Sequence, residues 1–165
     1  MEKRIVIVGS GVVGQATGKG LANKGFKVTF TDINPVVISQ LRKEGYEASE
    51  VQEVEKPDAD IFMISVPTYP LERRNDGIDF AMAASQSVGS WLSKLDRYSV
   101  VIVRSAVLPG TTEGMIVPIL EHRSGKIAGH DFGICVNPEY LRERSAQRDF
   151  ENPWVIVIGE LDKRS

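Results

Sequence analysis

The sequence predicts an α/β protein of the Rossmann type: a doubly wound, mainly parallel sheet of about six or more strands with helices on both faces. Three observations predict it. Ile5 to Val8 form an unbroken run of β-branched residues, the pattern of a strand buried on both faces. Glycines then follow at GxGxxG spacing and open a helical stretch over about residues 12–23. A second apolar run, residues 26–30, leads to an acidic residue, Asp32.

The glycine-rich turn has the features that binding of a dinucleotide requires. Gly9 permits a tight turn off the strand, Gly11 lets the backbone approach a pyrophosphate, and Gly14 lets the helix pack closely. The free N–H groups and the helix dipole attract the anion. The candidate cofactor contacts here are Gly9, Ser10, Gly11, Val12 and Gly14.

Asp32 predicts which dinucleotide is bound. Its carboxylate can accept hydrogen bonds from the adenosine ribose and would repel a 2′-phosphate, which favours NAD over NADP. The neighbouring Ile33 is a further candidate contact. The alternative is a glycine-rich turn in a doubly wound protein that binds another ligand, such as S-adenosylmethionine.

Composition and length narrow the class of protein. A chain of 165 residues fits one domain. The net charge of −2 and the lack of a basic stripe give nucleic-acid binding little support, and no apolar run reaches the ~20 residues of a membrane span. The first strand begins at once, which leaves no room for a signal peptide, and the single cysteine suits a reducing compartment, so we expect a cytoplasmic protein. The two histidines and the cysteine lie far apart in sequence, so no metal site is predicted.

The rest of the chain continues the alternation of strands and helices. Asn34 and Pro35 start a helix that Gly45 ends. The later predicted elements are a short strand with a surface connection in 46–60, strands at 61–66, 99–104, 132–136 and 154–158, and helices at 78–95 and about 111–122.

Polar residues follow several predicted strands at their carboxyl ends, where open parallel sheets bind ligands. The turn 67–70 contributes Pro67 and Thr68, and Ser105 follows the next strand. A rigid loop without ligand contact is an equally good interpretation of that turn. Arg73 and Arg74 could face a phosphate, although exposed arginines are usually only solvated.

Glu139 and Glu143 follow the strand at 132–136 and would share one face of a helical turn. From spacing alone, surface acids at a helix start are the simpler interpretation. Cys135, within that strand, fits a buried and unreactive thiol.

Together these stretches resemble the N-terminal half of the UDP-glucose/GDP-mannose dehydrogenase family. The resemblance rests on GSGVVG (9–14), TDIN (31–34), SVPT (65–68), RSAVLPGTT (104–112), and NPEYLRE (137–143) followed by NPWVIVIG (152–159). It implies oxidation of the C6 hydroxyl of a nucleotide sugar to a carboxylate with two molecules of NAD and no metal. The implied route passes through an aldehyde and a cysteine thioester, which water hydrolyses.

The resemblance also assigns roles to residues. It makes Val13, Asp32 and Thr68 cofactor contacts and Glu143 the residue with acid–base or water-activating work in thioester hydrolysis, with Glu139 as a second catalytic candidate. The implied sugar-pocket residues are Glu139, Tyr140, Leu141, Arg142 and Glu143. Three positions depart from the family pattern: Ala106 replaces a threonine, Arg144 a small residue, and Val37 a frequent lysine.

The resemblance places the family's nucleophilic cysteine, and its long dimer-forming helix, beyond residue 165. Cys135 does not match that cysteine. We therefore expect residues 1–165 to be a single NAD-binding domain, a fragment that binds NAD without full catalysis and is monomeric, whereas the full-length enzyme forms a homodimer and uses a nucleotide sugar such as UDP-glucose. The alternatives are a free-standing NAD-binding or NAD-sensing module and the cofactor half of a β-hydroxyacid type of dehydrogenase.

Overall fold

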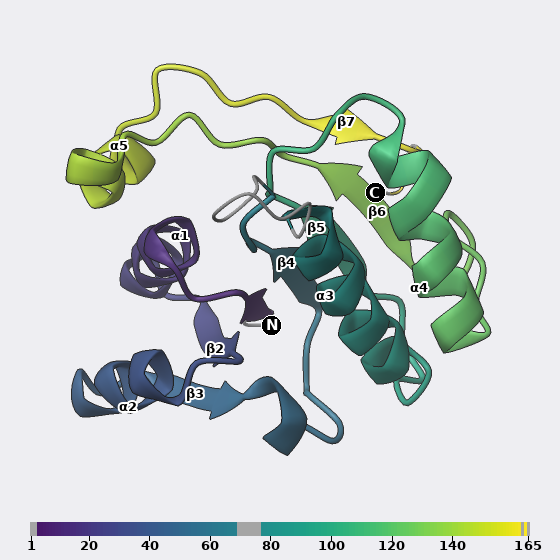
Figure 1. The fold of residues 1–165 in the computed structure, drawn as a ribbon, viewed down its shortest axis with the longest axis horizontal. Helices are drawn as coiled ribbons and strands as arrows, with labels where there is room; N and C mark the ends of the chain where they lie inside the picture. Colours follow the sequence, from purple (N-terminus) through teal and green to yellow (C-terminus); the bar gives the residue numbers. More distant parts are fainter. Residues whose placement is uncertain (1–2, 69–76, 163, 165) are drawn as a thin grey trace.

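The computed structural model describes residues 3–68, 77–162 and 164. Its strands form one seven-stranded sheet in the order β3-β2-β1-β4-β5-β6-β7 (Figure 1). The first six strands are parallel and β7 is antiparallel to β6. The order reverses between β1 and β4, the topological switch point where doubly wound sheets bind ligands. The strands are β1 Arg4–Val8, β2 Lys27–Asp32, β3 Glu47–Glu50, β4 Ile61–Ile64, β5 Val100–Val103, β6 Gly133–Val136 and β7 Gly159–Glu160.

Helices cover both faces of the sheet, which confirms the predicted class. The α-helices are α1 Val12–Asn23, α2 Pro35–Lys43, α3 Gly77–Leu92, α4 Val117–Ser124 and α5 Ala146–Glu151, and shorter turns are η1 Val51–Glu53, η2 Thr112–Ile116 and η3 Glu143–Ser145. Helices α3 and α4 lie on one face, over a core that includes Phe62 and Val101. Helices α1 and α2 lie on the other, over a core that includes Ile7 and Phe30, and α5 packs on α1. Within the described ranges, no helix is long and apolar enough to cross a bilayer.

The local helix signals act as predicted. The side-chain oxygen of Asn34 accepts a hydrogen bond of 3.0 Å from the backbone N–H of Val36, and Pro35 occupies the first turn of α2. The helix predicted over about 111–122 begins with the wide π-helical turn η2 and continues as α4. Pro118, at the start of α4, has no N–H to donate to the preceding turn, which accounts for the irregular start.

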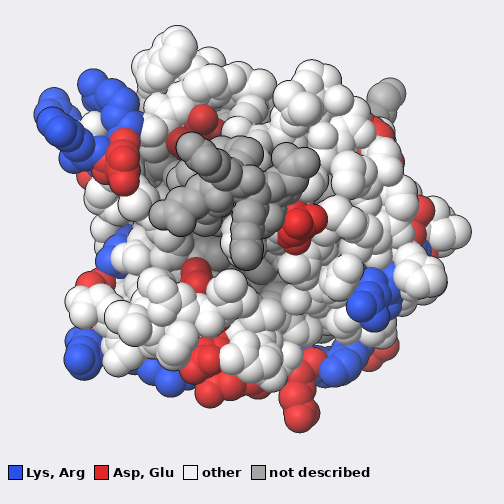
Figure 2. Space-filling model, in the orientation of Figure 1, with Lys and Arg blue, Asp and Glu red and all other residues white. Residues whose placement is uncertain are grey.

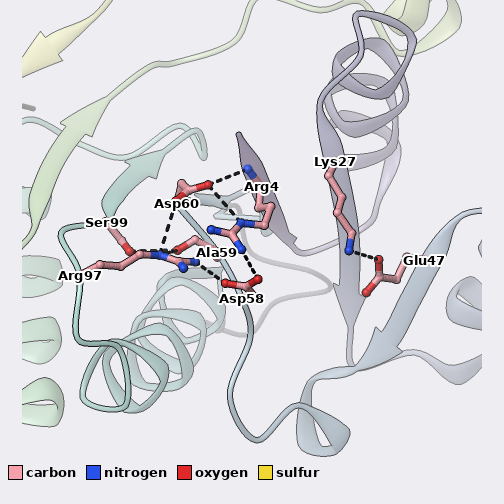
Figure 3. Close-up of polar contacts among 8 residues, drawn as sticks. All are labelled: Arg4, Lys27, Glu47, Asp58, Ala59, Asp60, Arg97 and Ser99. Atoms are coloured by element: carbon pink, nitrogen blue, oxygen red, sulfur yellow. Dashed lines mark hydrogen bonds and ion pairs between the residues drawn. The ribbon is translucent and has the colours of Figure 1, made fainter. Parts of the chain in front are cut away.

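A charged network joins three strands at the amino edge of the sheet (Figure 3). Arg4 and Arg97 both pair with Asp58 and Asp60, which precede β4, and the Arg97 Nη2 lies 2.6 Å from Asp58 Oδ1. The hydrogen bond from Arg97 is the main cause that lowers the pKa of the Asp58 carboxyl. Burial opposes ionisation of Asp60, yet hydrogen bonds from the backbone and side chain of Arg4 keep its pKa below the ordinary value. The network thus fastens the starts of β1, β4 and β5 together.

The prediction of a strand at 154–158 is wrong. Only Gly159 and Glu160 pair with β6, opposite Val136 and Cys135, and the apolar run before them is extended but unpaired. Pro138 cannot donate to a ladder that would continue past Val136. The Asn137 side-chain amide instead donates to the Val157 carbonyl at 2.7 Å. The last strand of the sheet is therefore Gly159–Glu160, directly after the predicted run.

Candidate functional site

The turn between β1 and α1 is built around glycines that no larger residue could replace without strain. Gly9 has φ +91°, and a Cβ at this position would lie 2.8 Å from the Val66 side chain and 2.9 Å from the Ser65 carbonyl oxygen. A Cβ on Gly14 would lie 2.0 Å from the Gly9 carbonyl oxygen. Gly18, which the sequence analysis did not single out, would place a Cβ 2.3 Å from the Phe30 ring. Because these glycines have no side chains, α1 can pack directly against β1 and β2.

Gly11 differs from its neighbours because its missing side chain leaves open space. It is exposed, and a Cβ built there meets nothing within 4 Å among the described residues. The fold therefore does not need a glycine here for packing. An open approach to the backbone at the N-terminus of a helix of 12 residues is the arrangement that a pyrophosphate requires. The residues present thus fit a dinucleotide.

Asp32 is held beside this turn by two backbone N–H groups. Its Oδ2 accepts a hydrogen bond of 2.6 Å from Ser10 N, and its Oδ1 accepts one of 2.8 Å from Asn34 N. The Ser10 hydroxyl is buried and donates to the Thr31 carbonyl, so Ser10 orients the carboxylate rather than offering its own side chain to a ligand. Val12 and Ile33 are 48% and 67% exposed at the rim, and Val13 is half-buried.

The loops after β4 and β5 are joined to each other across the switch point. Thr68 Oγ1 donates to the Ala106 carbonyl, and Ser105 Oγ donates to the Val66 carbonyl at 2.6 Å. Pro67 is exposed beside them. These bonds place the predicted contacts of both loops at the same edge as Gly9. Tyr69, Pro70, Arg73 and Arg74, which the sequence analysis also considered, lie outside the described residues.

The segment after β6 is irregular, so the expected helical face shared by Glu139 and Glu143 is not present. Residues 137–142 have no helical hydrogen bonding, and Glu143 only begins the short turn η3. The Glu139 carboxylate accepts from the backbone N–H of Leu141, which closes a local turn instead of a helix. Pro138 also disfavours a helical conformation at the residue before it.

Asp149 of α5 anchors this segment. Its Oδ2 accepts from the backbone N and the Nε of Arg142, both at 3.0 Å, and from Ser145 Oγ at 2.9 Å. Its Oδ1 accepts from Arg142 Nη2 at 2.6 Å. The hydrogen bonds from the Arg142 side chain and backbone lower the pKa of Asp149 far below the ordinary value. The Asp149 side chain is 14% exposed, whereas Arg142 is 78% exposed, so α5 fixes the loop while the cation stays in contact with water.

Arg104, at the end of β5, is a site residue that the sequence analysis missed. It is 7% exposed, donates from Nε to Thr17 Oγ1 of α1 at 2.8 Å and from Nη1 to Asn137 Oδ1, and lies over the Phe150 ring. Burial lowers the pKa of its guanidinium, while the negative charge of Glu139 acts in the opposite direction. An arginine that closes a strand usually reaches solvent, so the only sequence signal was its place next to Ser105.

A cavity of about 810 Å³ lies between α1, α5 and the segment after β6. Glu139, Tyr140, Leu141 and Arg142 of the predicted sugar-pocket residues line it, and the exposed Glu143 does not. The remaining lining is supplied by Leu21, Lys24, Arg104, Asn137, Pro138 and residues 149–156. The cavity therefore mixes charged, amide and aromatic groups, as a polar ligand with a ring would require.

Charged side chains of both signs are spread over the face drawn in Figure 2. On the face drawn in Figure 2, Lys and Arg are scattered among Asp and Glu, and the described part of that face has no continuous basic surface. Cys135 lies in β6 with a buried thiol, and burial raises its pKa. Within the described ranges, no group of three or more His, Cys, Asp or Glu side chains could hold a metal ion.

A switch-point glycine turn, an acid ending β2 and a doubly wound sheet define a Rossmann-type dinucleotide-binding domain. Comparison with known families makes the class specific. The chain belongs to the UDP-glucose/GDP-mannose dehydrogenase family, because the model of that family's NAD binding domain matches residues 3–57 and 45–165.

Individual relatives agree with this assignment. The chain is 36% identical to GDP-mannose 6-dehydrogenase of Pseudomonas putida over 98% of its length and 42% of that protein. Its structure is similar to a ternary complex of GDP-mannose dehydrogenase from Pseudomonas aeruginosa, with a TM-score of 0.85, 31% identity, and coverage of 98% of this chain and 42% of that one. A UDP-glucose dehydrogenase from Pyrobaculum islandicum also gives a TM-score of 0.85, with 30% identity, and coverage of 99% of this chain and 42% of that one. The chain thus spans less than half the length of these relatives.

Proposed function

We propose that these residues form the NAD-binding part of a nucleotide-sugar 6-dehydrogenase, and that the substrate class is a nucleoside diphosphate sugar with a free C6 hydroxyl. The observation that carries the cofactor half of the proposal is the Asp32 carboxylate, fixed by Ser10 and Asn34 beside the open backbone of Gly11. The relatives named for GDP-mannose and UDP-glucose support the substrate half.

Each group of residues has a proposed role. Gly9, Gly11, Val13 and Gly14 form the pyrophosphate turn, and Asp32 accepts from the ribose hydroxyls. NAD, when bound, accepts a hydride from the carbon that is oxidised. The contacts at the switch point are Pro67, Thr68 and Ser105, which lie at the carboxyl edge where the reactive end of a dinucleotide would extend.

The segment after β6 is the proposed sugar side of the site. Glu139, Tyr140, Leu141 and Arg142 offer it a carboxylate, a ring, backbone groups and a cation at the rim of the cavity. Glu143 is exposed and available to move a proton to or from water, which suits the acid–base role that the family resemblance implies. Asp149 holds this segment through Arg142, and Arg104 holds it through Asn137.

We further propose that these residues alone do not complete the oxidation to a carboxylate. Along the route that the family resemblance implies, that reaction needs a thiolate to form a covalent intermediate with the aldehyde. The cysteine of this chain, Cys135, is buried in β6 and its pKa is raised. The second candidate function, an NAD-binding or NAD-sensing module without catalysis, is favoured by the same observation.

Calorimetric titration of the chain with NAD and with NADP tests the cofactor assignment. We expect tighter binding of NAD, and we expect Asp32→Asn to reduce the preference at least about tenfold, or ~1.4 kcal/mol. Asp79→Asn, a change of the same type in the first turn of α3, is the matched control and should leave the preference unchanged. Equal affinity for both cofactors in the unmodified chain would contradict the role of Asp32.

Incubation with NAD and either UDP-glucose or GDP-mannose tests the substrate side. Formation of NADH is followed by absorbance and the sugar product by chromatography, and we expect no uronate. Production of uronate by both the unmodified chain and Cys135→Ser would refute a thioester route, whereas loss of production in Cys135→Ser would identify Cys135 as the nucleophile.

A further inference from the structure

Arg104 is a buried cation without a carboxylate partner. It is 7% exposed, and none of the ion pairs among the described residues includes it. Arginine stays protonated in proteins, so it cannot avoid the cost of burial by losing a proton. A buried charge usually has an ion of opposite sign beside it. The domain therefore holds a fixed positive charge whose counter-ion is not one of its described side chains.

Three contacts fix the orientation of the Arg104 guanidinium. Its Nε donates to Thr17 Oγ1 of α1 at 2.8 Å, its Nη1 donates to Asn137 Oδ1, and its central carbon lies 5.7 Å from the centre of the Phe150 ring of α5. Asn137 is itself held, because its Nδ2 donates to the Val157 carbonyl at 2.7 Å. The cation is thus in place before a ligand arrives, which reduces the entropy cost of binding.

Most of the hydrogen-bonding capacity of Arg104 is still free. These bonds use two of the five N–H donors of the guanidinium, and among the described contacts Nη2 has no acceptor. Nη2 does not belong to the side-chain atoms that are both fully buried and unpaired, which are the hydroxyls of Ser65, Tyr98 and Thr112. Because Arg104 lines the cavity of about 810 Å³, we infer that a ligand there can reach the free N–H groups.

The other charges of the cavity are either occupied or exposed. Arg142 and Asp149 are paired with each other, and the Glu139 carboxylate accepts from a backbone N–H. Burial lowers the pKa of Arg104, and the negative charge of Glu139 opposes this effect without forming an ion pair. Arg104 is therefore the buried cation that the cavity offers to an anion. The remaining charged residues of the lining are exposed, Lys24 and Glu151.

We propose that Arg104 binds an oxyanion of the ligand in this cavity, either the diphosphate of a nucleoside diphosphate sugar or the carboxylate of its oxidised product. Both groups present paired oxygens, which the two terminal nitrogens of a guanidinium fit. The Glu139 carboxylate, in the same cavity, can accept from a sugar hydroxyl of the same molecule. The inference rests on the proposed function, which supplies the class of ligand, and it adds a binding residue that the family resemblance does not assign.

Calorimetric titration of the chain with UDP and with glucuronate, in the presence of saturating NAD, tests the proposal. The NAD occupies the glycine turn, so UDP cannot bind there. We expect at least one of the two ligands to bind, and Arg104→Lys to weaken that binding at least about tenfold, because an ammonium group cannot replace the planar pair of donors. A loss for UDP identifies the diphosphate, and a loss for glucuronate identifies the carboxylate. The proposal is overturned if neither ligand binds, or if Arg104→Lys binds them as well as the unmodified chain does.

Arg123→Lys is the matched control, since Arg123 is exposed on α4 and its replacement should leave both affinities unchanged. Affinity for NAD, measured first, should be the same in the unmodified chain and in Arg104→Lys. A chain that binds no NAD would contradict the proposed function, whereas the titrations with UDP and glucuronate would still decide the role of Arg104. A variant that loses affinity for NAD as well would show general damage to the fold and would count against a direct contact.

Nuclear magnetic resonance of the guanidinium groups separates direct binding from a purely structural role. The ¹⁵N–¹H signals of Arg104 in the unmodified chain are assigned by their loss in Arg104→Lys. We expect them to shift when the bound ligand is added, and to stay in place when sodium chloride is added at the same ionic strength. Binding that leaves the Arg104 signals unchanged would mean that Arg104 only holds Asn137, and would overturn the proposal.

Discussion

Arg142 and Asp149 form a bidentate ion pair, with Nε 3.0 Å from Oδ2 and Nη2 2.6 Å from Oδ1. The backbone N–H of Arg142 donates to the same carboxylate, so Asp149 binds both the side chain and the main chain of one loop residue. A carboxylate with several N–H donors is strongly oriented. The consequence is that the conformation of residues 139–142 depends on α5, an element later in the sequence.

Replacement of Asp149 by Asn should lower stability in a pH-dependent manner. Because the folded-state pKa of Asp149 is lowered, its contribution is fully present above the unfolded-state value of about 3.9 and is lost as pH falls further toward the folded-state value. The difference in melting temperature between the unmodified chain and Asp149→Asn should therefore be constant from neutral pH to about pH 5 and shrink below about pH 4. A difference that does not depend on pH would show that the carboxylate charge is not the stabilising feature.

Gly11→Val should abolish NAD binding while the domain stays folded. A Cβ at Gly11 meets nothing within 4 Å, so the fold tolerates it, but a branched side chain would fill the approach to the helix N-terminus. Circular dichroism checks the fold and calorimetry the affinity, which should fall more than about tenfold. Gly114→Ala, another glycine with open space, is the control; retained binding in Gly11→Val would remove this turn from the cofactor site.

Gly20→Ala should destabilise the contact between α1 and α5 without removing the cofactor turn. A Cβ there would lie 2.1 Å from the Phe150 ring, and overpacking of this kind costs about 1–3 kcal/mol. Phe150→Ala in the same chain should relieve the clash, so the two changes should be strongly non-additive in urea denaturation. Additive effects would mean that α5 does not pack as described.

Arg104→Gln should lower the free energy of unfolding by about 1.5–3 kcal/mol, because the shorter side chain loses the hydrogen bonds that the buried cation donates to Thr17 and Asn137. Hydrogen exchange should accelerate most in residues 137–143, which Arg104 holds through Asn137. Lys27→Gln removes an exposed pair with Glu47 and should cost less than about 1 kcal/mol. Equal losses in both variants would argue against a special role for Arg104.

The elements around the cofactor turn could be predicted because their signals are local. The β-branched run of β1, the glycine spacing and the Asn34-Pro35 start of α2 each specify their structure through neighbouring residues. The segment after β6 could not, since its shape depends on which carboxylates accept from its backbone: Glu139 accepts from Leu141 within a local turn, and Asp149 of α5 accepts from Arg142.

The remaining failures have the same origin. Residues 154–158 have the composition of a strand. No ladder forms there because Asn137 and Pro138, in the adjacent segment after β6, do not supply its hydrogen bonds. From the sequence, Arg104 is a charged residue at the end of a strand. It is a buried cation only because α1, α5 and β6 pack around it. Sequence patterns describe what a segment prefers, whereas pairing and burial depend on partners far along the chain.

The network of Arg4, Arg97, Asp58 and Asp60 lies at the opposite end of β1 and β4 from the glycine turn. Gly9 follows the last residue of β1, while Arg4 is its first, so the whole length of a buried strand separates the two. We therefore expect substitutions among these four ions to change the stability of the domain without changing the shape of the cofactor turn, so that the two properties can be altered by separate mutations.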